Sequence, residues 1–211
     1  MLYNILQIAR DVRIAIDENK TGEQLIADED VDTLSLDEII RSKIAEGVRR
    51  VLIDAPVHLL DGGEPFGDAI YWRDKGAGWI LLPCDFMRLI IFKMSDWERP
   101  VYEAITAADP EYQLQHSRYK GIRGNPQKPV VAILSRQEGR VLELYSCKSE
   151  EATVEQALYL PLPKVDEYGG IEIPERCYRP VVYEVASLVL ATIGQGELST
   201  FMNELGKQLL T

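Results

Sequence analysis

The two histidines, His58 and His116, are the residues in this sequence best suited to acid–base or metal chemistry. His58 has Asp54 and Asp61 close to it in the sequence, and an Asp/His pair can act as a general base or bind a metal ion. No nucleophile motif accompanies the pair, since there is no G-x-S-x-G sequence and no cysteine in a recognisable catalytic context. We expect His58 to be a helix-end or loop residue, and a hydrolase that uses it is the least favoured alternative.

The remaining chemical motifs predict neither a metal nor a cofactor. The acidic string Asp28–Asp32 lacks the glycine at the sixth position and the glutamate at the twelfth that an EF-hand loop requires, so we expect a solvated or partner-facing loop. Neither a P-loop nor a G-x-G-x-x-G sequence is present. No C-x-x-C pair is present, since the three cysteines, Cys84, Cys147 and Cys177, lie far apart in the sequence. We therefore expect reduced thiols in a cytosolic setting.

Four aromatic residues can line a groove for a ligand: Tyr71, Trp72, Trp79 and Trp97. A small-molecule or peptide-binding module that uses Trp72 and Trp79 is therefore one alternative function. These two residues also flank one hairpin, where they can pair across the strands as part of a core. We favour the core interpretation, because large aromatic side chains usually contribute to cores.

Composition and charge indicate a soluble globular protein. The hydrophobic content of 46% is enough for a core, and no apolar run approaches the roughly 20 residues that a membrane helix needs. The N-terminus lacks the basic region of a signal peptide. The net charge of −11 argues against tight binding of nucleic acid, which requires clustered Lys and Arg, but is compatible with a surface that DNA passes.

Apolar periodicity predicts helices at both ends of the chain. Residues 2–16 form one apolar stripe, and residues 35–55 form a second, which begins with the capping box Ser35–Glu38 and ends before Pro56. The same periodicity predicts two further helices near the C-terminus, at residues 179–193 and 197–210. A short helix is expected at 100–108, because Pro100 suits a first helical turn.

Strand patterns fill the middle of the chain. We expect strands at 69–73, 79–82, 86–94, 130–134, 141–145 and 157–162, followed by an extended arm at 165–173. The run 86–93 carries apolar groups at both alternating sets of positions, so we expect this strand to be covered on both faces.

This order of elements predicts an α+β fold in which terminal helices form a bundle and a mostly antiparallel β module is inserted between its halves. The helical part comprises residues 1–60 and 174–211, and the β-rich module comprises residues 61–173.

Two long connections carry opposite charge. Residues 17–34 are acidic, and residues 111–129 place basic residues among aromatic ones. Oppositely charged loops can mate between neighbouring subunits or adjacent rings, so we take this contact as an interface hypothesis. Its residues are Asp28, Glu29, Asp30, Asp32, Arg118, Lys120, Arg123 and Lys128.

Three stretches carry a resemblance to known proteins: LLPCDFMRLIIFKMSDWERPV, YKGIRGNPQKPVVAI and CYRPVVYEVASLVLATIG. They resemble structural proteins of tailed phages, most closely the neck proteins of crAss-like and related phages of Bacteroides. The layout is similar to the tail tubular and head-to-tail adaptor family, whose members carry an L-P-x-D-φ-x-R-φ strand entry, where φ is apolar. The matching residues here are Leu82, Pro83, Asp85, Phe86, Arg88 and Leu89, and Cys84 stands where such proteins often have a second acid.

The resemblance implies a non-enzymatic virion protein that forms a ring, usually of twelve subunits, beneath the portal. Such a ring would bind the portal protein and adjacent neck or tail rings, and would leave a central channel for DNA without binding it specifically. The implied location is the virion neck, with the host cytoplasm during assembly, and no membrane or cofactor is implied. A negative charge suits this role, because an acidic channel wall does not trap a polyanion.

Overall fold

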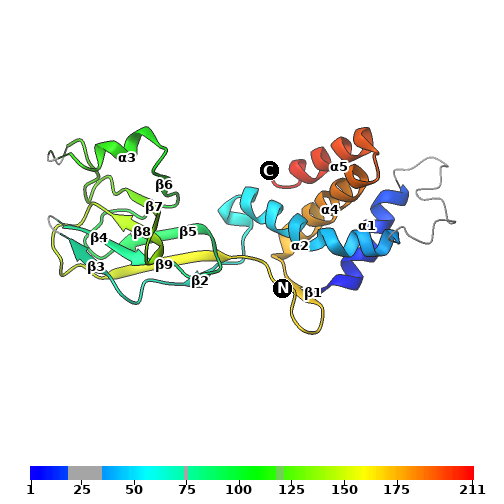
Figure 1. Cartoon of the computed structure of the whole chain (residues 1–211), viewed down its shortest axis with the longest axis horizontal. Helices are drawn as coiled ribbons and strands as arrows, with labels where there is room; N and C mark the ends of the chain where they lie inside the picture. The colour runs from blue at the N-terminus through cyan, green and yellow to red at the C-terminus, as the bar shows by residue number, and fades with distance from the viewer. Residues whose placement is uncertain (19–34, 74–75, 118, 120) are drawn as a thin grey trace. The chain divides into compact units, whose positions relative to one another are not determined.

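The computed structural model describes residues 1–18, 35–73, 76–117, 119 and 121–211 (Figure 1). Helices make up 38% of the structure and antiparallel or mixed sheets 27%, which confirms the predicted α+β class. The chain divides into a helical unit, Met1–Asp61 with Pro163–Thr211, and a β unit, Gly62–Leu162. We predicted the second boundary after residue 173, whereas residues 163–173 lie in the helical unit because strand β10 within them pairs with strand β1.

In its described residues the helical unit contains two short strands, two short 3-10 helices and four α-helices. In chain order these are β1 (Leu2–Asn4), α1 (Ile5–Glu18), α2 (Leu36–Asp54), η1 (Val57–Leu59), β10 (Gly170–Glu172), η3 (Glu175–Cys177), α4 (Tyr178–Thr192) and α5 (Gly196–Gln208). The helix predicted at 2–16 begins later, at Ile5, because the three residues before it pair with β10. Among the residues described, no helix is both long and apolar enough to cross a membrane.

Helix α2 begins as predicted. The Ser35 hydroxyl lies 3.4 Å from the Glu38 N–H, and the Glu38 carboxylate accepts the Ser35 N–H at 2.9 Å. This reciprocal pair satisfies two backbone donors that the first turn of a helix leaves open. The Ser35 N–H and, at 2.8 Å, the Ser35 hydroxyl both donate to the Glu38 carboxylate, and these two hydrogen bonds lower the pKa of Glu38 below its ordinary value.

Helix α4 packs against α1, α2 and α5 and is buried around most of its circumference, as the four consecutive buried positions from Glu184 to Ser187 show. The closest approach of α2 to α4 occurs at Gly47: a Cβ atom built there would lie 2.5 Å from Cγ2 of Val185. Real Cβ atoms do not come so close, so α2 and α4 require a residue without a side chain at this position.

Among the residues described, the β unit contains eight strands and one short α-helix. They are β2 (Glu64–Pro65), β3 (Tyr71–Arg73), β4 (Ala77–Leu81), β5 (Phe86–Met94), β6 (Ile105–Thr106), α3 (Pro110–Leu114), β7 (Val131–Arg136), β8 (Gly139–Leu144) and β9 (Val154–Pro161). They form a three-stranded sheet in the order β2-β9-β5 and a five-stranded sheet in the order β3-β4-β8-β7-β6. Strands β6 and β7 pair in parallel, and the other strand pairs that the structure describes are antiparallel.

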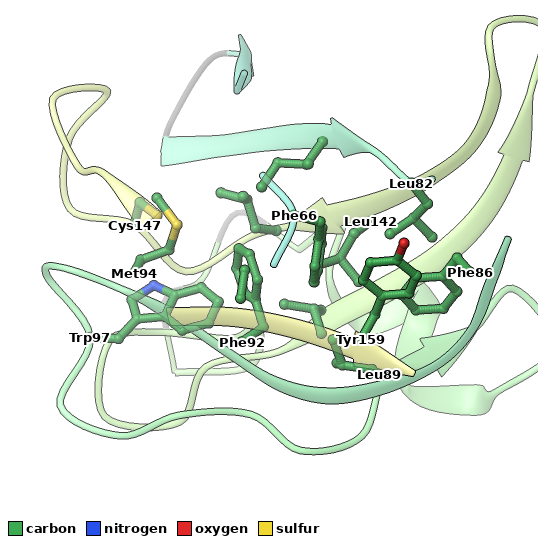
Figure 2. Close-up of a cluster of buried hydrophobic side chains, with 14 of the residues drawn as sticks. Phe66, Leu82, Phe86, Leu89, Phe92, Met94, Trp97, Leu142, Cys147 and Tyr159 are labelled. Atoms are coloured by element: carbon green, nitrogen blue, oxygen red, sulfur yellow. The ribbon is translucent and has the colours of Figure 1, made fainter. Parts of the chain in front are cut away.

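One hydrophobic cluster lies between the inner faces of the two sheets (Figure 2). The five-stranded sheet contributes side chains such as Ile80 and Leu142, and the three-stranded sheet contributes Phe86, Phe92 and Tyr159. The rings of Phe86 and Tyr159 stack with centroids 5.5 Å apart. Such aromatic pairs add packing energy to the burial of their surface, so this cluster holds the two sheets together.

Strand β5 departs from the strict alternation that we expected for residues 86–93. Its register against β9 shifts between Phe86 and Arg88 and between Leu89 and Ile91, which are β-bulge positions. The shifts bring Leu89 to the inner face with Phe86, although odd and even positions alternate in a regular strand. Hydrophobic alternation alone does not reveal such an inserted residue.

The prediction of a helix at 100–108 is wrong. Val101 forms a β-bridge with Phe92, and Ile105 and Thr106 form β6. Asp109 Oδ2 accepts the Thr106 N–H at 2.6 Å, and the helix with a proline in its first turn begins later, at Pro110. Pairing with the sheet therefore overrides the local preference of Pro100 for a first helical turn.

Replacement of Gly47 by alanine tests the packing of α2 on α4. Alanine favours a helix by about 1 kcal/mol. The new methyl group would press on Val185 at a cost of about 1–3 kcal/mol, so we expect a net loss of up to about 2 kcal/mol in unfolding free energy. Gly206→Ala on α5 is the matched control, because the nearest atom to its Cβ is 3.4 Å away, and this variant should be as stable as the wild type or more so. Urea denaturation measures the unfolding free energy of both variants. A Gly47→Ala variant more stable than the wild type would contradict the close packing of α2 on α4.

The cysteines should differ in reactivity. Cys84 is exposed, whereas burial raises the pKa of Cys147 to about 12 and that of Cys177 to about 11. We expect iodoacetamide at pH 8 to label Cys84 rapidly and the other two only after unfolding, as peptide mass spectrometry would show. The raised values imply stability that is fully present below pH ~9 and lost as the pH rises toward 12, because the unfolded thiols ionise first. Equal labelling rates of the three cysteines in the folded protein would contradict the predicted difference in reactivity.

Candidate functional site

The outer face of the five-stranded sheet carries charged and aromatic side chains in place of an apolar surface. The register pairs Tyr71 of β3 with Trp79 of β4, and Trp79 with Glu143 of β8. Cross-strand partners project from the same face of a sheet, so these three side chains lie in one row. Arg73 and Tyr145, two residues away along β3 and beyond β8, belong to the same face.

The row is built around a stack on Trp79. The Tyr71 ring lies over the indole with a centroid distance of 4.2 Å and an interplanar angle of 15°, and the Arg136 guanidinium carbon lies 5.4 Å from the ring centroid. We expected Trp72 and Trp79 to pair across the hairpin as part of a core. The pairing is wrong, whereas the core interpretation is confirmed for Trp97, which is 3% exposed, and for Trp72. Trp72 pairs with Gly78 and packs on the inner cluster, so the two tryptophans project from opposite faces.

Glu143 supplies a buried negative charge beneath this stack, with its side chain only 5% exposed. Its Oε1 forms ion pairs with Arg136 and, at 3.4 Å, with Arg73, and its Oε2 accepts the hydroxyl of Tyr145. Burial raises the pKa of Tyr145, which therefore keeps its proton to donate. Burial, and then the neighbouring Arg73, lower the pKa of Arg136, but a guanidinium remains charged at neutral pH.

These contacts limit what Glu143 can do chemically. A carboxylate that acts as a general base needs an oxygen within reach of the substrate proton. Both oxygens of Glu143 already bind protein groups, so its role is to hold the two arginines in place.

A hollow of about 820 Å³ opens beside this network. Arg73 and Glu143 line it, and consecutive residues of β7 and its turn, from Ile133 to Glu138, line it as well. Tyr112 and His116, whose rings meet edge to face at 5.1 Å, form another wall. Its volume is in the range of ligand sites.

Two smaller hollows have less polar organisation. One of about 450 Å³ lies in the β unit beside Trp72, with Asp68, Glu150 and Glu151 in its lining. The other, of about 250 Å³, lies in the helical unit, where Glu184 accepts the Asn203 amide at 2.7 Å. In the part of the chain that the structure describes, no group of three or more His, Cys, Asp or Glu side chains could hold a metal ion.

The predicted interface residues are only partly visible. Outside the described residues lie Asp28, Glu29, Asp30, Asp32, Arg118 and Lys120. Arg123 is half-buried, and Lys128 is exposed beside a tight turn in which its N–H binds the carbonyl of Asn125 at 2.9 Å. The proposed mating of the acidic and basic connections therefore stays a prediction.

His58 lies in the 3-10 helix η1 and is exposed. Among the described residues the structure gives it no carboxylate partner. Its position after α2 matches the helix-end location that we expected. His116 is exposed on the wall of the hollow described above.

Sequence reasoning singled out Tyr71 and Trp79 but missed Arg73, Arg136 and Glu143. One signal was available: Glu143 interrupts the apolar run Val141–Tyr145, and a carboxylate in a buried strand needs a cationic partner. The identity of that partner depends on strand order, which the sequence pattern does not give.

No family model matches the chain, and no curated protein matches it.

Replacement of Glu143 by glutamine tests the buried network. The amide has nearly the same shape but leaves Arg136 buried without its counter-charge, so we expect a loss of about 3 kcal/mol in unfolding free energy. Arg13→Met is the matched control, since it breaks the exposed ion pair with Asp37 and should cost less than about 1 kcal/mol. Chemical denaturation measures both, and equal small losses would show that the network does not stabilise the fold.

Proposed function

We propose that this protein is a non-enzymatic structural subunit of the neck of a tailed phage. It forms a ring that connects portal and capsid to the tail and leaves a channel through which DNA passes during ejection. It acts in the virion and is present in the host cytoplasm during assembly.

The observation that carries the proposal is the chain corner at residues 82–89, where the resemblance to neck and adaptor proteins is centred. Pro83 ends the path of β4, and the Phe86 N–H closes the turn on the Pro83 carbonyl at 3.1 Å. The Asp85 carbonyl accepts the Leu162 N–H at 2.7 Å, and its carboxylate lies 3.0 Å from the Tyr159 hydroxyl. Pro83, Asp85 and Phe86 thus each have a distinct structural task, which supports a shared fold as the source of the resemblance.

The division of charge supports a role beside DNA. The helical unit has 11 Lys and Arg against 20 Asp and Glu, and the β unit has 12 against 14. Their net charges are therefore −9 and −2. A surface dominated by the acidic unit would let a polyanion pass without binding it. Two units of different net charge also suit the head-to-tail contacts of a ring, in which two different faces meet.

Exposed apolar side chains near the N-terminus support extensive protein contacts. Met1, Leu2, Leu6 and Tyr168 are between 56% and 89% exposed. Leu2 and Tyr168 belong to the neighbouring segments that the β1–β10 pairing joins, and Leu6 follows in α1. Large apolar side chains with this degree of exposure suit a surface that another protein covers.

A reversal of charge in the basic connection tests the proposal. We expect the triple variant Arg118→Glu, Lys120→Glu and Arg123→Glu to lose ring formation, because the acidic connection of a neighbour would be repelled. Its circular dichroism spectrum should stay that of the wild type. Analytical ultracentrifugation with the portal protein from the same genome measures the assembly.

The control places the same charge change at three exposed positions elsewhere, Arg41, Arg49 and Lys207. This control should assemble as the wild type does. Normal assembly of the first variant would refute the charge-mated contact, and no assembly of the wild type with portal or other neck proteins would refute the ring itself.

A further inference from the structure

We propose that the edge of strand β7 at Ser135 is a binding site for an extended acidic segment of another protein chain, which joins the sheet as an added strand. The proposal concerns the hollow beside the Glu143 network and does not depend on whether the chain forms a ring.

The hairpin of β7 and β8 fixes the direction of the backbone groups. Its two-residue turn joins Arg136 to Gly139, so these two residues exchange both of their backbone hydrogen bonds. Bonded and non-bonded pairs alternate along an antiparallel ladder, so Leu134 also bonds to β8. Ser135, between them, directs its N–H and C=O away from β8 and toward the outer edge of the sheet.

The outer edge is covered only at the start of β7. Strand β6 has two residues, and its parallel pairing ends where Thr106 meets Ile133. Among the described residues, the structure gives no hydrogen bond to the Ser135 backbone on this side, and Ser135 is exposed. An open N–H and C=O at a sheet edge is a template for an incoming strand.

The lining of the hollow follows strand β7, beside which an added strand would lie. Consecutive residues from Ile133 to Glu138 line it, and neighbouring residues of a strand project from opposite faces. The hollow therefore borders the edge of β7 and is not confined to one face. Tyr112 and His116 wall it, and its volume of about 820 Å³ accommodates several residues of peptide.

Arg73 gives the site a preference for acidic side chains. Its side chain is 52% exposed and makes one 3.4 Å contact with Glu143 at the lining of the hollow. A guanidinium has five donors, so several remain for a ligand carboxylate. Glu138 at the turn is also exposed in the lining, and its negative charge would repel a carboxylate of the ligand. We therefore expect that carboxylate to lie at Arg73 and not at the turn.

Peptide titration of the full-length protein tests the site. The probe is a synthetic peptide with the sequence of residues 21–34, which holds five acidic residues, and its control carries Asn and Gln at those positions. We expect the acidic peptide to bind at concentrations below about 1 mM and the neutral one roughly tenfold more weakly. Hydrogen exchange of the Ser135 amide should slow when the acidic peptide is bound, because that N–H then donates to the peptide.

Two substitutions locate the contact. Ser135→Pro removes the N–H at an edge position and should weaken binding at least roughly tenfold, whereas Ser135→Ala keeps the backbone donor and should bind as the wild type does. Arg73→Gln should weaken binding of the acidic peptide and leave binding of the neutral one unchanged. If Ser135→Pro does not fold, two other measurements test the site: the exchange rate of the Ser135 amide in the wild-type protein and the affinity of Arg73→Gln for the acidic peptide.

Three results would overturn the proposal: no binding of the acidic peptide at 1 mM, equal binding of the acidic and neutral peptides, or unchanged Ser135 exchange in the bound state.

Discussion

The β unit depends on the corner where the chain leaves one sheet and enters the other. Between Leu82 and Phe86 the backbone must turn without losing its hydrogen bonds, and four groups from elsewhere supply partners. The Arg140 carbonyl accepts the Leu82 N–H at 2.9 Å, and the Arg140 guanidinium donates to the Phe86 carbonyl at 2.9 Å. Asp85 receives the Leu162 N–H and lies within reach of the Tyr159 hydroxyl. Because Phe86 then enters the cluster between the sheets, this turn fixes how both sheets meet.

The same arrangement determines what the outer face can present. Once the inner face of the five-stranded sheet takes Ile80 and Leu142, the alternating residues Trp79 and Glu143 must project outward. The Arg136 guanidinium neutralises Glu143 and covers Trp79, so a charge that would be costly alone becomes part of a rigid surface. A polar surface beside an open strand edge suits the binding of peptides, and the role that we propose for the edge of β7 rests on this arrangement.

The predictable parts of the fold are those that local chemistry decides. The capping box at Ser35 appears where the sequence indicated because it depends on neighbouring residues alone. The strand from Phe86 to Met94 appears where expected because its run of apolar, strand-favouring residues is a local signal. Strand order, the bulges of β5 and the pairing of Trp79 with Tyr71 depend on partners distant in the sequence. For that reason the Glu143 network was missed, although Tyr71 and Trp79 beside it were recognised individually.

The central claim is that this chain is a structural subunit which assembles with a portal, and its particle mass in solution tests that claim most directly. Native mass spectrometry would compare the protein alone, the portal protein from the same genome alone, and their mixture. We predict a large complex with a fixed ratio of the two proteins in the mixture. A chain that remains monomeric with the portal and with every other neck protein of that genome would contradict the claim.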